Sequence, residues 1–143
     1  MRGARRGGGF AMPGHNPLAL AFRPARLVSH PALFMRLVII ESPYAGDIEA
    51  NVAYARACVR DSLSRGEAPI ASHLLYTQPG ILRDDIPAER QWGIAAGLAW
   101  RDVAAASVVY TDRGISAGME YGIAAAREAG KPVEFRSLGK ATG

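Results

Sequence analysis

The sequence predicts an α/β domain in which helices cover both faces of a mainly parallel sheet of four or five strands. Three observations support this fold class. Short apolar runs rich in β-branched residues alternate with longer helical patterns along the chain, which is typical of a parallel sheet with helical crossovers. Polar loops that contain glycine follow the first three apolar runs. The hydrophobic fraction of 49% is sufficient for a substantial core.

The first half of the predicted domain contains a strand, a helix and a second strand. The run Arg36–Ser42, RLVIIES, is short, apolar and β-branched, so we expect a buried strand. Asp47 is placed to cap a helix that Gly66 ends. A second strand is expected over Ala68–Leu75. The helix carries an apolar stripe at spacings of three and four, formed by Ile48, Val52, Ala55, Val59 and Leu63.

The second half contains two more helices and two more strands. After a long polar loop, YTQPGILRDDIP, Pro87 opens a helix that runs to about Trp100. A third strand is expected over Ala104–Thr111. Ser116 then caps a helix that ends at Gly130, and KPVEFRSL supplies a fourth strand. This order predicts a Rossmann-like three-layer domain, whose ligands lie beyond the carboxyl ends of the strands.

The net charge of +4 belongs to the N-terminal leader rather than to the predicted domain. No acidic residue precedes Glu41, whereas from Arg36 onward 12 basic residues stand against 13 acidic ones. A nucleic-acid-binding domain would need a basic face on its folded part, so no nucleic acid is expected as a partner of the core. Residues 1–35 are interpreted as a flexible basic extension rich in Gly, Pro and Arg, with a transit-like segment or a phosphate-binding arm as alternatives.

The domain is expected at residues 36–138, followed by a tail at 139–143. No run approaches 18 uninterrupted apolar residues, so no membrane span is expected. The single cysteine, Cys58, lies in an apolar-periodic segment and is interpreted as a buried thiol. Because His73 has no His or Cys at ligand spacing, neither a metal nor another cofactor is predicted. These features fit a cytoplasmic protein.

A carboxylate stands close to the start of the last predicted helix, in TDRGISAGMEYGIAAA. With Ser116 as the cap, Glu120 lies one position later than a capping box requires, because Met119 occupies the third helical position. The helix dipole keeps such a glutamate ionised, which suits a carboxylate nucleophile. Gly114 and Gly118 allow a ligand to approach the backbone closely. The alternative is a solvated glutamate that only complements the helix dipole.

Several motifs together resemble the nucleoside 2-deoxyribosyltransferase-like family, which includes 2'-deoxynucleoside 5'-phosphate N-hydrolases. These motifs are SPYAGD after the first strand, DRGISAGMEYGIAAA and GKPV, and the similarity extends from about Arg36 to Leu138. The late G-x-E-x-G element is the most specific of them. The resemblance implies cleavage of an N-glycosidic bond, in which positive charge develops on the sugar and a carboxylate stabilises or captures it.

The resemblance also implies catalytic residues. Glu120 matches the glutamate that the family uses as nucleophile on the anomeric carbon. The family's helical aspartate, which helps to protonate the departing base, has no counterpart here, since alanines and Gly97 occupy the corresponding turn. The candidates for this general acid are Asp84, Asp85 and Asp112, and the predicted rim favours Asp85 and Asp112.

Residues of the rim loops are implied in substrate binding. The loop after the first strand and the late motif should hold the sugar and any 5'-phosphate, while the second loop should contact the base. The predicted binding residues are Ser42, Tyr44, Gly46, Asp47, His73, Gly114, Ser116 and Gly118, with Tyr76 and Gln78 as further candidates for base contacts. For His73, a strand-end histidine without a ligand is the alternative.

The predicted function is N-glycosidic cleavage of, or deoxyribosyl transfer from, a 2'-deoxynucleoside or its 5'-monophosphate. The main alternative is a nucleotide-binding module without catalysis, which the missing helical aspartate favours. A ribonucleotide phosphoribohydrolase is a third possibility, but its Gly-Gly-x-Gly-Thr pattern is not reproduced. Relatives assemble as oligomers, so at least a homodimer is expected, and Trp92 and Trp100 are predicted to pack in the core or in a subunit interface.

Overall fold

The computed structural model describes residues 34–139 and gives them an α/β fold with a four-stranded, all-parallel sheet. This confirms the predicted fold class. The predicted extension, residues 1–35, and the tail, residues 139–143, lie almost entirely outside the described residues. Within the described part of the chain, no helix has both the length and the apolar character needed to cross a membrane.

The sheet has the strand order β2-β1-β3-β4, so β1 and β3 are central and every pair is parallel. Val38 of β1 lies opposite Ala106 of β3. Parallel neighbours need a crossover, and the connecting segments here contain the helices. The strands are β1 (Arg36–Glu41), β2 (Glu67–Ile70), β3 (Ala106–Tyr110) and β4 (Val133–Arg136).

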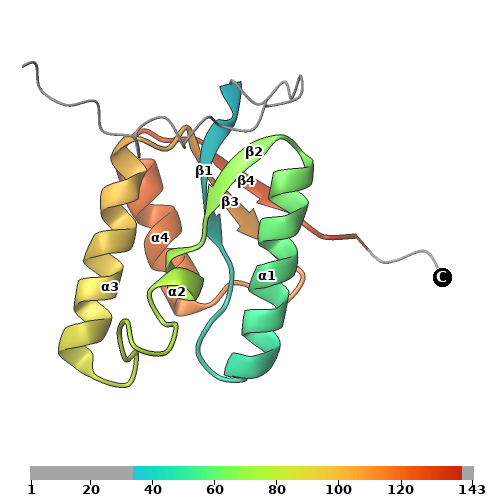
Figure 1. Ribbon diagram of the computed structural model, residues 1–143. Helices are drawn as coiled ribbons and strands as arrows, with labels where there is room; N and C mark the ends of the chain where they lie inside the picture. The colour runs from blue at the N-terminus through green and yellow to red at the C-terminus, as the bar shows by residue number, and fades with distance from the viewer. Residues whose placement is uncertain (1–33, 140–143) are drawn as a thin grey trace, which may run out of the picture. The chain divides into compact units, whose positions relative to one another are not determined.

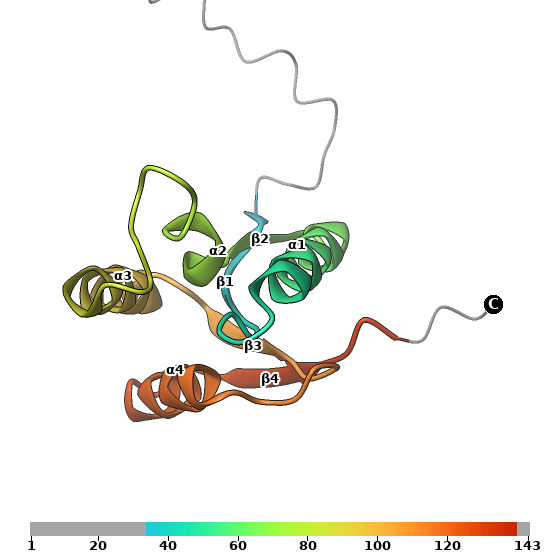
Figure 2. The same ribbon diagram turned by 90° about the horizontal axis from the view of Figure 1, so that it is seen from below.

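Helices cover both faces of this sheet. Figure 1 shows α1 on one side of the strands, and Figure 2, seen from below, shows α3 and α4 on the opposite side. The short helix α2 follows β2 directly. The helices are α1 (Ile48–Ser64), α2 (Ser72–Leu75), α3 (Pro87–Ala99) with the 3₁₀ turn η2 (Trp100–Asp102), and α4 (Ala117–Glu128).

Both predicted helix caps are confirmed. The Asp47 carboxylate accepts a hydrogen bond from the Ala50 backbone N–H at 3.2 Å, and the Ser116 hydroxyl accepts one from the Met119 N–H at 3.3 Å. Each bond satisfies an amide that the first helical turn leaves without a partner. The Met119 sulfur in turn accepts from the Ser116 N–H at 3.4 Å, in the place of the acid of a capping box.

The prediction of a strand over Ala68–Leu75 is wrong in its second half. The strand ends at Ile70, and Ser72–Leu75 form α2. The Ala71 carbonyl starts this helix by accepting hydrogen bonds from the N–H groups of Leu74 and Leu75. A short apolar run does not by itself distinguish a strand from a buried helical turn. Here α2 packs against α3, where a Cβ on Gly97 would lie 2.9 Å from the Ser72 Cβ.

The alternating side chains of β1 divide the core in two. Val38 and Ile40 point towards α1 and pack with Cys58, which confirms the predicted burial of this thiol. A second cluster, on the other face, joins Met119 and Ile123 of α4 to Val109 of β3. This division follows from the two-residue period of a strand, and it sends Ile39 and Glu41 of β1 to the α4 side.

A network of ion pairs that includes the buried Glu67 connects the two edge strands, β2 and β4. Glu67 of β2 is 6% exposed and accepts two hydrogen bonds from the Arg136 guanidinium of β4, at 2.6 and 2.8 Å. Ser62 donates a third bond to the same carboxylate at 2.6 Å. These bonds lower the pKa of Glu67, with Arg136 as the main cause. Arg36 of β1 extends the network by pairing with Glu134 at 2.7 Å.

Arg136→Met should lower the free energy of unfolding by about 3 kcal/mol at neutral pH, because it removes both hydrogen bonds from the guanidinium to the buried Glu67 carboxylate and leaves it only Arg36, at 3.5 Å. The difference in unfolding free energy between the wild type and this variant should become smaller as the pH falls. The folded-state pKa of Glu67 is depressed, so the stability from this pair is present above the unfolded pKa and disappears as acid protonates the carboxyl. Urea unfolding over a range of pH measures both effects.

Arg65→Ala is the matched control, because the Arg65–Asp61 pair is a solvent-exposed i,i+4 contact. It should change the free energy of unfolding by less than about 1 kcal/mol. Equal losses for the two variants would contradict a special role for the buried network.

Candidate functional site

A cavity of about 590 Å³ lies beside the carboxyl end of β1, on the face of the sheet that carries α3 and α4. Residues of the loop after β1, of α2, of α3 and of the start of α4 line it. Its floor reaches Ile39 and Ser107 in the middle of the sheet. The cavity thus occupies the place where ligands bind in open parallel sheets.

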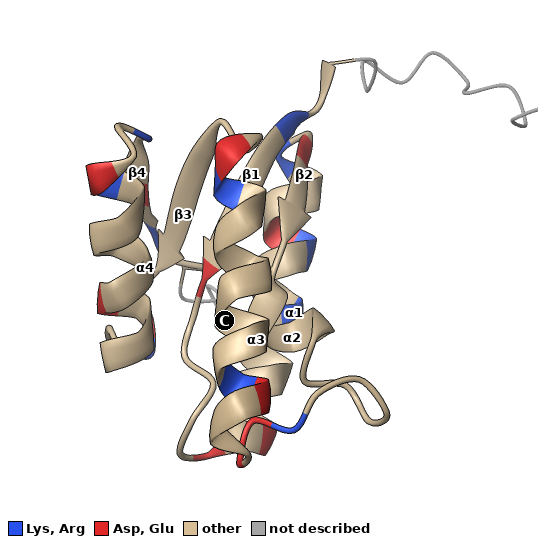
Figure 3. Cartoon of the chain, turned by 90° about the vertical axis from the view of Figure 1, so that its left-hand side faces the viewer, with Lys and Arg blue, Asp and Glu red and all other residues tan. Residues whose placement is uncertain are grey.

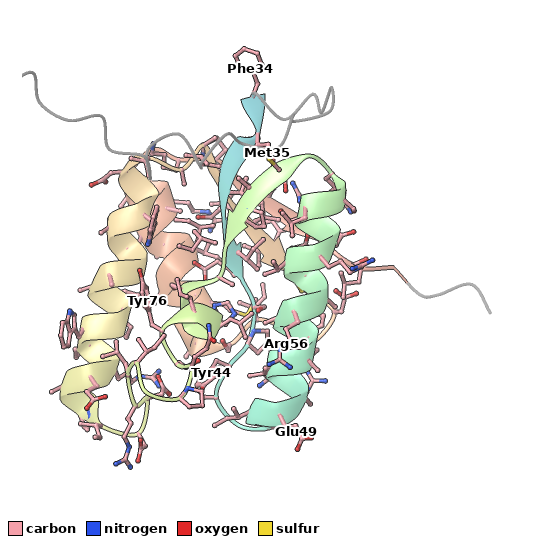
Figure 4. The ribbon with its side chains drawn as sticks, in the orientation of Figure 1. Phe34, Met35, Tyr44, Glu49, Arg56 and Tyr76 are labelled. Carbon is pink, nitrogen blue, oxygen red and sulfur yellow. The ribbon has the colours of Figure 1, made fainter. Side chains whose placement is uncertain are left out.

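Five of the eight predicted substrate-binding residues line this cavity. They come from three different elements, and the tertiary structure brings them together. These residues are Ser42, Tyr44, His73, Ser116 and Gly118. Tyr44 and Tyr76, both labelled in Figure 4, add aromatic surface from the loop after β1 and from the end of α2, whereas Gln78 does not line the cavity.

Gly46, Asp47 and Gly114 do not line the cavity. Asp47 caps α1, so its carboxylate is occupied by the helix. Gly46 and Gly114 adopt φ values of +94° and +77°, which side chains other than glycine rarely adopt, and they shape the turns of the rim. The binding roles predicted for these three residues therefore stay predictions from the sequence.

Asn51 holds two of the rim loops in place. Its amide nitrogen donates to the carbonyls of Tyr44 and Ala45, both at 3.0 Å, and its oxygen accepts from the Arg113 guanidinium at 2.9 Å. The side chain is buried on the first turns of α1. The loop after β1 is therefore fixed by hydrogen bonds before any ligand arrives.

Ser42 and His73 form a polar pair inside the cavity. The Ser42 hydroxyl lies 2.7 Å from the His73 Nε2, a hydrogen bond between the end of β1 and α2. Burial lowers the pKa of His73 to about 4. The imidazole is therefore neutral at physiological pH, and the pair can present uncharged donors and acceptors to a sugar or a base.

Glu41, the last residue of β1, places a carboxyl in the same cavity. Burial raises the pKa of Glu41 to about 8. Within residues 34–139, its side chain has no hydrogen bond or ion pair to another side chain or backbone group. We did not predict Glu41 from the sequence, although a charged residue at the end of the apolar run RLVIIE was the available signal.

Glu120 lies outside this cavity. Its side chain is exposed and borders a separate shallow depression with Ile123, Ala124 and Arg127. The helical period explains this placement: Met119 and Ile123 of α4 are buried in the core, while Tyr121 and Gly122 line the cavity, which leaves Glu120 on the solvent side. The helix that carries the sequence motif lines the cavity with other residues, and the Glu120 carboxylate is on another of its faces.

Asp85 and Asp112 also lie outside the cavity. Asp85 is exposed and paired with Arg83 at 2.6 Å. Asp112 accepts a hydrogen bond from the Tyr54 hydroxyl at 2.6 Å, which is the main cause of its lowered pKa. A carboxylate that stays ionised is a poor proton donor. Of the three aspartates considered, Asp84 lines the cavity, where it is paired with Arg90 at 2.8 Å.

Arg101 in η2 adds a positive charge to the cavity lining. Its buried Nε has no hydrogen-bond partner in the described part of the chain. A buried donor without an acceptor is destabilising, so an anionic or polar ligand group would be favoured there. Among residues 34–139 there is no cluster of three His, Cys, Asp or Glu side chains suited to a metal ion.

The ring of His73 should remain neutral as the pH falls from 7 to 5, because its folded-state pKa is about 4. The unfolded chain binds the proton first, near pH 6.5, so the stability contributed by this histidine is present above that pH and decreases below it. Two-dimensional NMR of the imidazole nitrogens measures the protonation state of the His73 ring at each pH, with its signals assigned by comparison with His73→Gln. A midpoint near 6.5 for His73 would contradict the buried neutral pair.

The fold has a counterpart among solved structures. The 2-deoxyribosyltransferase of the psychrotolerant bacterium Bacillus psychrosaccharolyticus matches with a TM-score of 0.52 and 17% sequence identity, over 75% of this chain and 76% of that chain. This match confirms the predicted resemblance at the level of the fold. No curated protein matches the sequence. The family model described as "Domain of unknown function (DUF7768)" matches residues 36–136. The chain therefore belongs to the DUF7768 family, with a fold similar to that of a 2-deoxyribosyltransferase.

Proposed function

We propose that this protein cleaves the N-glycosidic bond of a 2'-deoxynucleoside or its 5'-monophosphate, or transfers the deoxyribosyl group to another base. One observation carries the proposal: a fold similar to a 2-deoxyribosyltransferase holds a cavity at the carboxyl end of β1, lined by five of the predicted binding residues. Its volume of about 590 Å³ is suitable for a nucleotide-sized ligand.

The lining supports separate roles for the parts of such a substrate. Ser42, His73 and Ser116 offer hydrogen-bonding groups for the sugar hydroxyls. The tyrosines Tyr44 and Tyr76 offer aromatic surface for a base. Arg101 is available for an anionic group such as a 5'-phosphate, because its Nε lacks a partner within residues 34–139. This arrangement favours a nucleotide over a purely apolar ligand.

The assignment of Glu120 as nucleophile remains a prediction from the sequence motif. Its exposure outside the cavity, together with the positions of Asp85 and Asp112, specifically favours the second candidate function, a nucleotide-binding module without catalysis. The two functions differ in one measurable property. An enzyme releases free base from the bound ligand, whereas a binding module releases the ligand unchanged.

Incubation with a panel of deoxynucleosides, deoxynucleotides and ribonucleotides, followed by chromatography of free base, tests the proposal. We expect base release from a 2'-deoxy substrate. Ser42→Ala should lower kcat/KM by about fivefold or more, because it removes the hydroxyl proposed to bind the sugar, a contact worth about 1 kcal/mol, and frees the His73 ring that this hydroxyl holds. Ser64→Ala is the control, since this exposed hydroxyl caps a carbonyl at the far end of α1 and does not line the cavity. Saturable binding without base release would support the binding module.

We further propose a homodimer in which α3 meets its counterpart. No residue of α3 is buried, and Trp92 is 66% exposed, so this tryptophan is not part of the core. Residues 91–100 carry no charge, as the uncharged body of α3 in Figure 3 shows. Because α3 also walls the cavity, a neighbouring subunit on this helix would close the site from outside.

Light scattering coupled to size-exclusion chromatography should give a dimer mass for the wild type at micromolar concentration. Trp92→Glu should shift it to the monomer mass, because a charge replaces the largest exposed apolar side chain of α3. Ile48→Glu, which alters another exposed apolar residue on a different helix, α1, is the control and should not change the mass. A monomeric wild type would contradict the proposed dimer.

A further inference from the structure

We propose that Glu41 is the catalytic carboxyl of the cavity and that it supplies the proton to the departing base. This inference rests on the proposed N-glycosidic chemistry and names the group that the sequence motifs left unassigned. Three features support it: the other cavity carboxylates are engaged, Glu41 lies against Gly122 of α4, and Glu41 makes no ion pair within residues 34–139.

Among residues 34–139, three carboxyl side chains line the cavity, and two of them are engaged. Asp84 is paired with Arg90 at 2.8 Å. Glu89 accepts a hydrogen bond from the Arg83 backbone N–H. The carboxyl of Glu41 makes neither kind of contact within the described residues, so it is the one available to a ligand.

The geometry of α4 leaves room for this carboxyl. Gly122, in the second turn of α4, faces the end of β1, and a Cβ at this position would lie 2.6 Å from the Glu41 Cδ. Any larger residue at 122 would therefore displace the Glu41 side chain. Glu41, Ser42 and His73 all line this cavity, and the Ser42 hydroxyl lies 2.7 Å from the His73 Nε2, so the carboxyl and the polar pair belong to one site.

The electrostatic surroundings suit a proton donor. Titratable and charged groups that line the same cavity are His73 on α2, Tyr44 and Tyr76, Asp84, Glu89, Arg90, Arg101, and Tyr121 on α4. His73 is neutral, Arg90 is paired with Asp84, and Arg101 makes no ion pair with Glu41 within the described residues. Burial raises the pKa of Glu41 to about 8. Glu41 is therefore mostly protonated at neutral pH, as a general acid requires.

The proposed step is a cleavage of the N-glycosidic bond assisted by proton transfer, with no change of oxidation state. The bond between C1' and the base nitrogen breaks, its electron pair goes to the base, and the Glu41 carboxyl gives its proton to the base. Water then forms a bond to C1', and the proton that it loses returns to the Glu41 carboxylate. In transfer, the incoming base nitrogen replaces water and supplies the proton. The products are the free base and a sugar that carries either hydroxyl or the new base.

The test compares Glu41→Gln with Glu128→Gln, a control at the exposed C-terminal end of α4 that does not line the cavity. Glu41→Gln should reduce kcat by about a hundredfold or more while KM stays within a few fold, because the amide keeps the shape but has no proton to donate. Glu128→Gln should retain wild-type kcat. Thermal unfolding of both variants shows whether the fold is intact.

Two further measurements separate a proton donor from a structural residue. The wild-type rate should fall as the pH rises through about 8, and Glu41→Asp should retain part of the activity with a displaced pH profile. Carbon-13 NMR of labelled glutamates should show one carboxyl titrating near that pH, which disappears in Glu41→Gln. This signal does not depend on catalysis.

The outcomes distinguish this inference from the proposed function. If the wild type releases base and Glu41→Gln is equally active, Glu41 is not the donor, although the proposed function stands. Equal losses of kcat for Glu41→Gln and Glu128→Gln would overturn the inference in the same way, and so would a rate that rises through pH 8. If the wild type releases no base from any member of the panel, the proposed function fails and the inference fails with it.

Discussion

The two-residue period of β1 is the constraint on which the rest of the structure depends. Val38 and Ile40 must face α1 to form the main core, so Ile39 and Glu41 must face α4. A slip of one residue would bury the Glu41 carboxyl against α1 and send Ile40 into the cavity. The apolar core thus determines on which side of the sheet a carboxyl reaches the site.

The faces of α4 have three different surroundings: the core, the cavity and the solvent. Met119, Ile123 and Ala126 seal the core, Gly118 and Gly122 leave space for the cavity, and Glu120 with Arg127 faces solvent. At Gly122 the absence of a side chain has a physical reason, since a Cβ there would occupy the position of the Glu41 carboxyl. A strand and a helix that are far apart in sequence therefore depend on each other at a single contact.

Sequence reasoning recovered the order of the elements because their signals are local. β-branched runs, the caps Asp47 and Ser116, and the apolar stripe of α1 each act within a few residues. The error at Ser72–Leu75 arose where packing against Gly97 of α3 decides between strand and helix. The sequence also placed loops at the carboxyl end of the sheet. It did not specify which side chains of these loops face the cavity.

By itself the sequence determined the α/β class, the positions of both helix caps and most residues of the loops that surround the site, since periodicity and capping are properties of neighbouring residues. The tertiary structure alone decided which carboxyl enters the cavity. Glu41 and Glu120 are 79 residues apart, and only the docking of α4 on β1 turns one inward and the other outward. Such a choice depends on the rotation of a helix against a sheet, which no local pattern specifies.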